Sequence, residues 1–273
     1  MHSASRDALA RARDRLERLV DPTSDPAELD RLGGELFAVA GLLDRELPLR
    51  RALVDSSAPE GSRTELADRL LGDKVDEATG RTVRELVADR WSNSTELVEA
   101  VEELATQATL AVAEKDDSLS DVEDELFRFG RILEREPRLR TLLADDTTPP
   151  DMRVELLESV LEDKVRSTTA RLLEQAVRAP HHRSIDRQAE FLAELAAQRR
   201  SRSIARVVAA TTLTDEQERR LADSLSTLYG RQVSVQVDVD PELIGGAVVT
   251  LGDEVIDGSV ASRLRAASEA LPH

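Results

Sequence analysis

A chain of 273 residues is long enough for two domains, and with 2% aromatic against 40% hydrophobic residues its cores have to be built from Leu, Val and Ala. Its formal net charge of −17 repels phosphate groups and anionic lipid headgroups, which argues against nucleic acid or a membrane surface as a direct partner. The absence of cysteine excludes disulfides, thiolate metal sites and cysteine nucleophiles.

The N-terminal segment at residues 5–14 carries charges throughout, so it does not resemble a secretory leader. No later run approaches the roughly 18 to 20 apolar residues that a membrane-spanning helix needs. We therefore expect a cytoplasmic protein that does not insert directly into a membrane.

From residue 5 to residue 200 the apolar residues recur at helical spacing. The first two stripes are Leu9, Ala12, Leu16 and Leu19, and then Leu29, Leu32, Leu36, Ala40 and Leu43. Helix starts are indicated by Asp25 before Pro26, and by Ser120 and Thr214, each followed three residues later by an acid or an amide. The pattern predicts a series of short amphipathic helices.

An internal duplication becomes visible when the sequence is shifted by 90 residues. ELFAVAGLLDRELPLRRALVD at residues 35–55 then aligns with ELFRFGRILEREPRLRTLLAD at residues 125–145. The match continues through a shared proline, arginine and Asp-Lys-Val tripeptide, and later moves to an offset of 91. Two unrelated Leu-rich segments would not share prolines and charges in this way, so the pattern indicates a tandem duplication.

Each copy contains several short helices, which can bury their apolar stripes only by closing into a bundle. Residues 94–114 carry one long stripe, and we expect this helix to close the first bundle and to open the second. The sequence predicts a first helical bundle at residues 1–110, the added copy, and a second at residues 111–200.

After residue 200 the periodicity changes. Residues 204–208 and 233–239 predict strands, and the helix predicted between them, at 214–229, has Leu221, Leu225 and Leu228 on its inward face. Two further strands form a hairpin around a Gly-Asp turn, and a last helix follows at residues 258–270. The predicted fold is mainly α: two tandem helical bundles, then a small α/β domain at residues 201–273 in the order β-α-β-β-β-α.

No residue pattern indicates a catalytic, cofactor or metal site. His181 and His182 are adjacent in a predicted loop without a third ligand at helical spacing, so a solvated loop is favoured over a metal site. Gly245 and Gly246 lack the spacing of a phosphate-binding loop and are better explained as the flexible entry to the hairpin. The acidic residues of the hairpin lack a histidine partner, and we interpret them as turn and cap residues.

The segment DPELIGGAVVTLGDEVIDGSVASRLR at residues 240–265 resembles the delta subunit of bacterial F-type ATP synthase, the oligomycin-sensitivity-conferring protein of mitochondria. The shared pattern is an acidic residue, a Gly-Gly pair, a hydrophobic strand, Gly-Asp, and an Asp-Gly-Ser segment that ends in Arg-Leu. Its main positions are Asp240, Gly245, Gly246, Gly252, Asp253, Asp257, Gly258 and Arg263, for which structural roles are expected. Residues 119–202 resemble the family's N-terminal helical domain more loosely.

The resemblance implies a non-catalytic stator subunit of the proton-translocating F-type ATP synthase, without a cofactor. It implies that the helical part holds N-terminal helices of the alpha subunits. The C-terminal part would hold the b subunits of the peripheral stalk, so that rotor torque is coupled to ATP synthesis. The protein would then lie at the cytoplasmic face of the plasma membrane as a peripheral component.

The second helical copy departs from the ordinary family member and is similar to the lengthened delta subunits of actinobacteria. The duplication leaves open which copy holds which alpha-subunit helix, and no partner-binding residue can be transferred to either copy.

Two alternatives remain from the sequence alone. One is an enzyme or regulator that uses the acidic bundles as a ligand pocket, which would need a convergent set of polar residues. The other is a helix-binding scaffold in a different assembly. Co-purification separates them, because a stator subunit should bring down alpha, beta and b polypeptides.

Overall fold

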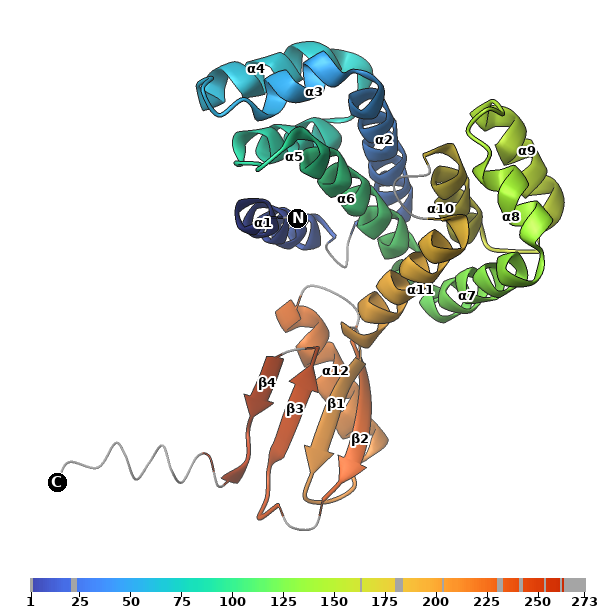
Figure 1. Cartoon of the computed structure of the whole chain (residues 1–273). Coiled ribbons are helices and arrows are strands. Elements are labelled where there is room, and N and C mark those ends of the chain that lie inside the picture. The colour runs from blue at the N-terminus through green and yellow to red at the C-terminus, as the bar shows by residue number, and fades with distance from the viewer. Residues whose placement is uncertain are drawn as a thin grey trace. The chain divides into compact units, whose positions relative to one another are not determined.

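The computed structural model describes residues 2–20, 24–162, 164–179, 184–202, 204–229, 233–240, 243–252, 254–260 and 262. The chain separates into two units, residues 1–196 and 197–273. The first unit is helical, and the second contains a sheet (Figure 1). The predicted division into three domains, at residues 110 and 200, stays a prediction.

The helices that begin in the first unit follow one another with short connections. They are α1 (Ser3–Leu19), α2 (Pro26–Arg45), α3 (Leu47–Val54), α4 (Glu60–Leu71), α5 (Glu77–Ala88), α6 (Ser94–Lys115), α7 (Leu119–Arg135), α8 (Pro137–Ala144), α9 (Pro150–Leu161), α10 (Ser167–Arg178) and α11 (Ile185–Arg202). A short 3₁₀ segment, η1 (Gly72–Lys74), follows α4.

The helix boundaries repeat along the chain and confirm the duplication. Helices α3, α4 and α5 begin at residues 47, 60 and 77, and α8, α9 and α10 begin at residues 137, 150 and 167, which is 90 residues later in each case. Helices α6 and α11 begin at residues 94 and 185, which is the offset of 91 expected for this part. We call α2–α5 the first copy and α7–α10 the second copy.

Burial repeats as well. The matched leucines that are buried are Leu36 and Leu126, Leu43 and Leu133, Leu53 and Leu143, and Leu71 and Leu161. Leu66 and Leu156 are both partly buried against the core of their own copy. The same apolar positions therefore support both bundles, as the repeated sequence predicts.

A polar contact is repeated in the same place. The Glu35 Oε2 atom of α2 accepts hydrogen bonds from the Asp76 backbone N–H at 2.9 Å and the Thr79 hydroxyl at 2.6 Å. Glu125 makes both contacts in the second copy, at 2.9 and 2.5 Å. Because the first turn of a helix leaves N–H groups without partners, each glutamate stabilises the start of the helix opposite.

Helix α6 contributes to two apolar cores, as predicted. Leu97, Leu104 and Ala108 belong to the cluster of the first copy. Leu110 and Ala113, towards the end of the same helix, belong to the cluster of the second copy. One continuous helix therefore links the two bundles.

The structure confirms one predicted helix start in this unit and corrects another. Asp25 precedes α2 and its side chain accepts a hydrogen bond from the Ala27 N–H at 2.9 Å. Ser120, in contrast, lies inside α7, because the chain leaves α6 by a tight turn in which the Ser118 N–H donates to the Ala113 carbonyl at 2.8 Å. This turn starts α7 at Leu119, before the predicted cap.

The second unit is a four-stranded sheet with one described helix. Its strands are β1 (Ile204–Ala209), β2 (Ser234–Val239), β3 (Ala247–Leu251) and β4 (Glu254–Asp257), in the spatial order β2-β1-β3-β4. Helix α12 (Asp215–Tyr229) connects β1 to the parallel strand β2, whereas β3 is antiparallel to β1 and to β4. These elements confirm the predicted order up to β4, and of the predicted last helix only residues 258–260 and 262 are described.

Helix α12 covers one face of the sheet (Figure 1). Its reciprocal capping box is confirmed, since the Thr214 N–H donates to Gln217 Oε1 at 2.9 Å and the Gln217 N–H donates to the Thr214 hydroxyl at 3.3 Å. Leu225 is buried against the sheet, but Leu228 is 68% exposed, so its predicted inward position is wrong. Helix α12 packs on the sheet through Leu221, Leu225 and Tyr229, which are spaced four apart, and Leu228 lies outside this spacing. The predicted stop at Gly230 lies outside the described residues.

Candidate interaction surfaces

The Gly-Gly pair before β3 crosses the chain that leaves β4. Gly245 and Gly246 have φ angles of 151° and 81°, values that favour glycine. A Cβ atom on Gly246 would lie 2.4 Å from the Gly258 carbonyl oxygen. Backbone hydrogen bonds join the two segments, from the Gly258 N–H to the Ala247 carbonyl at 3.0 Å and from the Val260 N–H to the Gly245 carbonyl at 2.9 Å. The glycines therefore allow close packing of two backbones.

The Asp-Gly-Ser segment forms a turn and a cap. The Asp257 side chain accepts a hydrogen bond from the Ser259 N–H at 2.9 Å, and the buried Ser259 hydroxyl accepts one from the Ser262 N–H at 3.2 Å. Asp240, at the end of β2, donates its N–H to the Ala209 carbonyl at 2.9 Å. These contacts give the three residues structural roles.

Gly252 and two further residues complete the C-terminal pattern. Gly252 lies in the turn of the β3–β4 hairpin with a φ angle of 59°. Asp253 and Arg263 lie outside the described residues, as do His181 and His182. That the eight positions act as a family signature stays a prediction.

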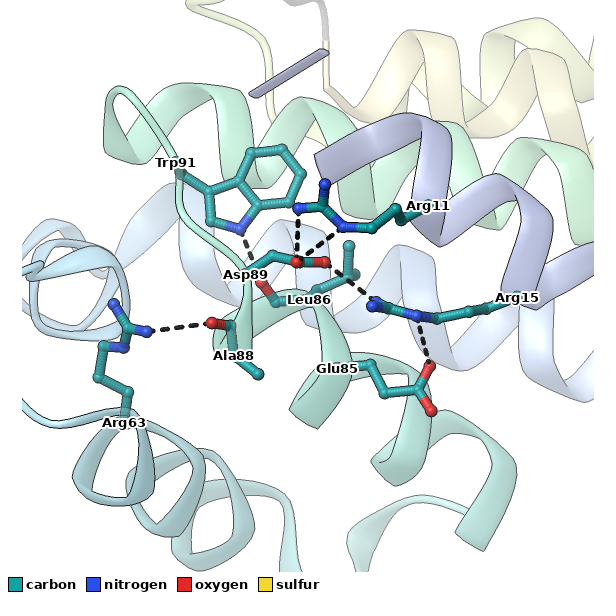
Figure 2. A network of polar contacts seen from close by, with 8 residues as sticks. All are labelled: Arg11, Arg15, Arg63, Glu85, Leu86, Ala88, Asp89 and Trp91. Carbon is teal, nitrogen blue, oxygen red and sulfur yellow. Dashed lines mark hydrogen bonds and ion pairs between the residues drawn. The ribbon is translucent and has the colours of Figure 1, made fainter. Parts of the chain in front are cut away.

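A polar network joins α1 to the end of α5 (Figure 2). The Asp89 carboxylate accepts hydrogen bonds from Arg11 Nη2 at 2.7 Å and Arg15 Nη1 at 3.0 Å. Beside it the Trp91 indole N–H donates to the Leu86 carbonyl at 2.6 Å. Here two cations share one carboxylate and the indole satisfies a helix-end carbonyl, so we interpret the network as an anchor for α1.

The arginine shared by the two copies has a structural role. Arg63 and Arg153 are 6% and 4% exposed, which is unusual for arginine. Arg63 donates to the Ala88 carbonyl at 3.1 Å, and Arg153 donates to the Leu143 carbonyl at 3.4 Å. Both guanidinium groups therefore hydrogen-bond to backbone carbonyls near helix ends, where cations are favoured.

The described residues contain no group of three or more His, Asp or Glu side chains arranged to hold a metal ion. No helix in the described part of the chain combines the length and the apolar character needed to cross a bilayer.

Exposed apolar side chains occur in both units. In the helical unit they are Leu47 in α3 and, in the second copy, Phe127, Ile132, Leu142 and Met152. In the second unit they are Leu228, Val239, Ile244, Val255, Ile256 and Val260. The sequence reasoning missed these positions because it followed the buried stripes. Phe127 could have been found from its place beside Leu126, since adjacent helical residues point in different directions.

Known proteins are similar to this chain over most of its length. The family described as ATP synthase delta (OSCP) subunit matches residues 105–271. ATP synthase subunit delta of Streptomyces avermitilis is 48% identical over 263 residues, which covers 96% of this chain and 96% of that protein. The same subunit of Acidothermus cellulolyticus is 44% identical over 265 residues, with 97% of each chain covered. That of Frankia alni is 44% identical over 275 residues, with 99% of each chain covered.

The family match begins within α6 and so includes the second copy and the sheet. The relatives also cover the first copy, because their similarity extends over nearly the whole chain. This agrees with the predicted lengthened type of actinobacterial subunit. The chain belongs to the ATP synthase delta (OSCP) subunit family, whose members are non-catalytic subunits of the peripheral stalk.

Proposed function

We propose that this chain connects the alpha subunits of the catalytic head to the b subunits of the peripheral stalk. The helical unit would bind N-terminal helices of the alpha subunits, and the C-terminal unit would bind the b subunits. Because the chain joins the head to the peripheral stalk, the head cannot turn with the rotor. Rotor torque is then used for ATP synthesis. The chain acts by binding and carries out no chemical step itself.

The observation that carries the proposal is the division of the chain into two units, each with its own core and its own exposed apolar side chains. A connector needs two separate binding surfaces, and exposed apolar side chains on each unit can provide them. Amphipathic helices bind to such surfaces through apolar residues spaced three and four apart.

The proposal also includes a location at the cytoplasmic face of the plasma membrane, as a peripheral component held by other subunits. Membership of the complex supports this location. The net charge of −17 supports contact with protein rather than with anionic lipid.

Fragments 1–202 and 203–273 test the assignment, because α11 ends at Arg202. Circular dichroism first checks that each fragment is folded. Titration calorimetry then measures the binding of the full chain and of each fragment to a peptide copying the N-terminus of an alpha subunit, and to the C-terminal part of a b subunit. We expect the alpha peptide to bind fragment 1–202 and the b segment to bind fragment 203–273.

Salt gives a second readout. If apolar burial dominates, affinity should change little with ionic strength, since a screening length of about 8 Å at physiological salt weakens mainly exposed charge pairs. Exchange of the two partners between the fragments would reverse the assignment, and absence of binding to the full chain would refute the proposed connection.

A further inference from the structure

One face of α2 in the first copy is covered by the second copy. Phe37 packs against the apolar clusters of both copies. Arg171 of α10 reaches the same face, where its Nη1 atom lies 3.0 Å from the Asp30 carbonyl oxygen and 2.5 Å from Asp30 Oδ1. The same guanidinium lies 3.7 Å from the Cβ position of Gly34. Asp30, Gly34 and Phe37 therefore form a helix-covered face.

The equivalent face of α7 is open. We define the α7 face as Ser120, Asp124, Phe127 and Arg131, the residues 90 positions after Asp30, Gly34, Phe37 and Gly41. The four positions are half-buried in α2, whereas all four are exposed in α7. Phe127 is 57% exposed.

The α7 face is continuous along the helix. Residues 120, 124, 127 and 131 are spaced four, three and four apart, so they lie on one side of α7. The phenylalanine shared by both copies is thus sheltered in one copy and left in water in the other, although the two backbones have the same order of helices.

We propose that the α7 face binds an amphipathic helix of another subunit of the complex, and that this helix places an apolar side chain on Phe127 and a basic side chain next to Asp124. The proposal rests on membership of the family and not on which subunits the two units hold.

Two observations indicate that the partner helix carries a basic side chain next to Asp124: the equivalent contact in the first copy, and the charge of this chain. In the first copy the position of Gly34 lies next to the guanidinium of Arg171, and the second copy has Asp124 at that position. Arg128 pairs with Asp124 across 3.5 Å, but both side chains are about 70% exposed, with values of 73% and 69%. So exposed a pair is weak, and a partner cation can replace or join it. The net charge of −17 favours a basic partner over an acidic one.

A second copy of this chain is the competing occupant. Its α5 carries Arg81 at the position that matches Arg171, and Arg81 is half exposed, with a Glu77 contact at 2.9 Å. Such a contact would join the first copy of one chain to the second copy of the next, and its repetition would produce open filaments. In a closed complex, a helix of a different subunit is therefore favoured over a second copy of this chain as the occupant of the α7 face.

Photo-crosslinking in the purified ATP synthase complex tests the proposal, with p-benzoylphenylalanine in place of Phe127. Two matched controls carry the same group in place of Met152, which is 58% exposed in α9, and in place of Phe37. Mass spectrometry identifies the linked residues. Position 127 should link to a helical segment of another subunit with Lys or Arg within one turn of the linked residue. Position 37 should link within the chain, close to Arg171.

A yield at position 127 no higher than at position 152 would overturn the proposal. So would a link to an acidic or non-helical segment, or to a second copy of this chain. Retention in the complex gives an independent measurement: Phe127→Glu should reduce the chain that co-purifies by about tenfold, while Met152→Glu should not. Both substituted side chains are exposed, so unchanged thermal unfolding of the isolated variants checks that the fold is intact. Equal retention of the two variants would contradict the proposal.

Discussion

At the scale of single residues, the two copies keep one ion pair while exchanging its charges. Arg31 of α2 pairs with Asp76, with 2.6 Å between Nη1 and Oδ2. Ninety residues later the positions are reversed, and the Arg166 Nε atom donates to Asp121 Oδ2 at 2.8 Å. A pair that is maintained by opposite changes at both ends depends on the sign of the interaction rather than on residue identity.

This reversal predicts the outcome of a charge swap in the first copy. Arg31→Asp and Asp76→Arg should each lower the free energy of unfolding only slightly, because the side chains are 57% and 51% exposed and solvent screens their interaction. The double variant should regain most of the loss, since the second copy accommodates the reversed pair. A double-mutant cycle in urea measures the coupling, and strictly additive losses would contradict the prediction.

Glu96 holds the start of α1 against α6. Its Oε1 atom accepts a hydrogen bond from the His2 N–H and lies 2.9 Å from His2 Nδ1. Burial raises the pKa of Glu96, but hydrogen bonds from Ser5 and His2 outweigh this, and the pKa is lowered overall. A carboxyl with a lowered pKa in the folded state adds stability that is complete above its ordinary pKa of about 4.3 and is lost as the pH falls through the folded value.

Glu96→Gln should therefore destabilise the protein at pH 7, and the difference from the wild type should shrink below pH of about 4. Urea unfolding measured from pH 7 downward follows this change. Glu99→Gln, at an exposed position of the same helix, is the matched control and should have little effect at any pH. A loss in Glu96→Gln that stays constant as the pH falls would show that the charge is not responsible.

At the scale of elements, close backbone contacts determine where glycine is required. Gly246 combines a φ angle of 81° with a Cβ position 2.4 Å from a carbonyl oxygen, so an added methyl group is opposed by backbone strain and by a clash. Gly61, in the first turn of α4, has no atom within 4 Å of its Cβ position and no such strain.

The two glycines should respond to alanine with opposite signs. Gly246→Ala should destabilise the C-terminal unit by more than about 1 kcal/mol, whereas Gly61→Ala should be neutral or stabilise the helical unit by up to about 1 kcal/mol. Chemical denaturation of both variants gives the two values. A Gly246→Ala variant as stable as the wild type would contradict the prediction. It would show that the chain before β3 and the chain after β4 can move apart without a loss of stability.

At the scale of the whole molecule, the described residues contain no group of three or more His, Asp or Glu side chains that could hold a metal ion. The isolated chain should neither hydrolyse ATP nor retain a stoichiometric metal ion, because its motifs lack the convergent polar groups that these activities need. A phosphate-release assay and elemental analysis measure both. One tightly bound zinc ion per chain would contradict the expectation and would direct attention to His181 and His182.

The sequence by itself determined the order of the helices, the duplication and the change from helices to strands after α11. These features depend on local information: apolar spacing fixes which face of a helix can be buried, and glycine tolerates backbone angles that other residues avoid. The exact starts of helices were predicted less reliably from the sequence. The Asp25 cap and the Thr214 box form as predicted, but the turn between α6 and α7 displaced the predicted start at Ser120.

Only the tertiary structure decided which repeated positions are covered. Phe37 and Phe127 occupy the same place in nearly the same local sequence, yet the second copy shelters one and leaves the other 57% exposed. In α12, Leu225 and Tyr229 pack against the core of the sheet, whereas Leu228, three residues after Leu225, is left exposed. Helical periodicity specifies a direction around one helix axis, whereas burial also requires a neighbour in that direction, and neighbours are set by contacts between segments far apart in the chain.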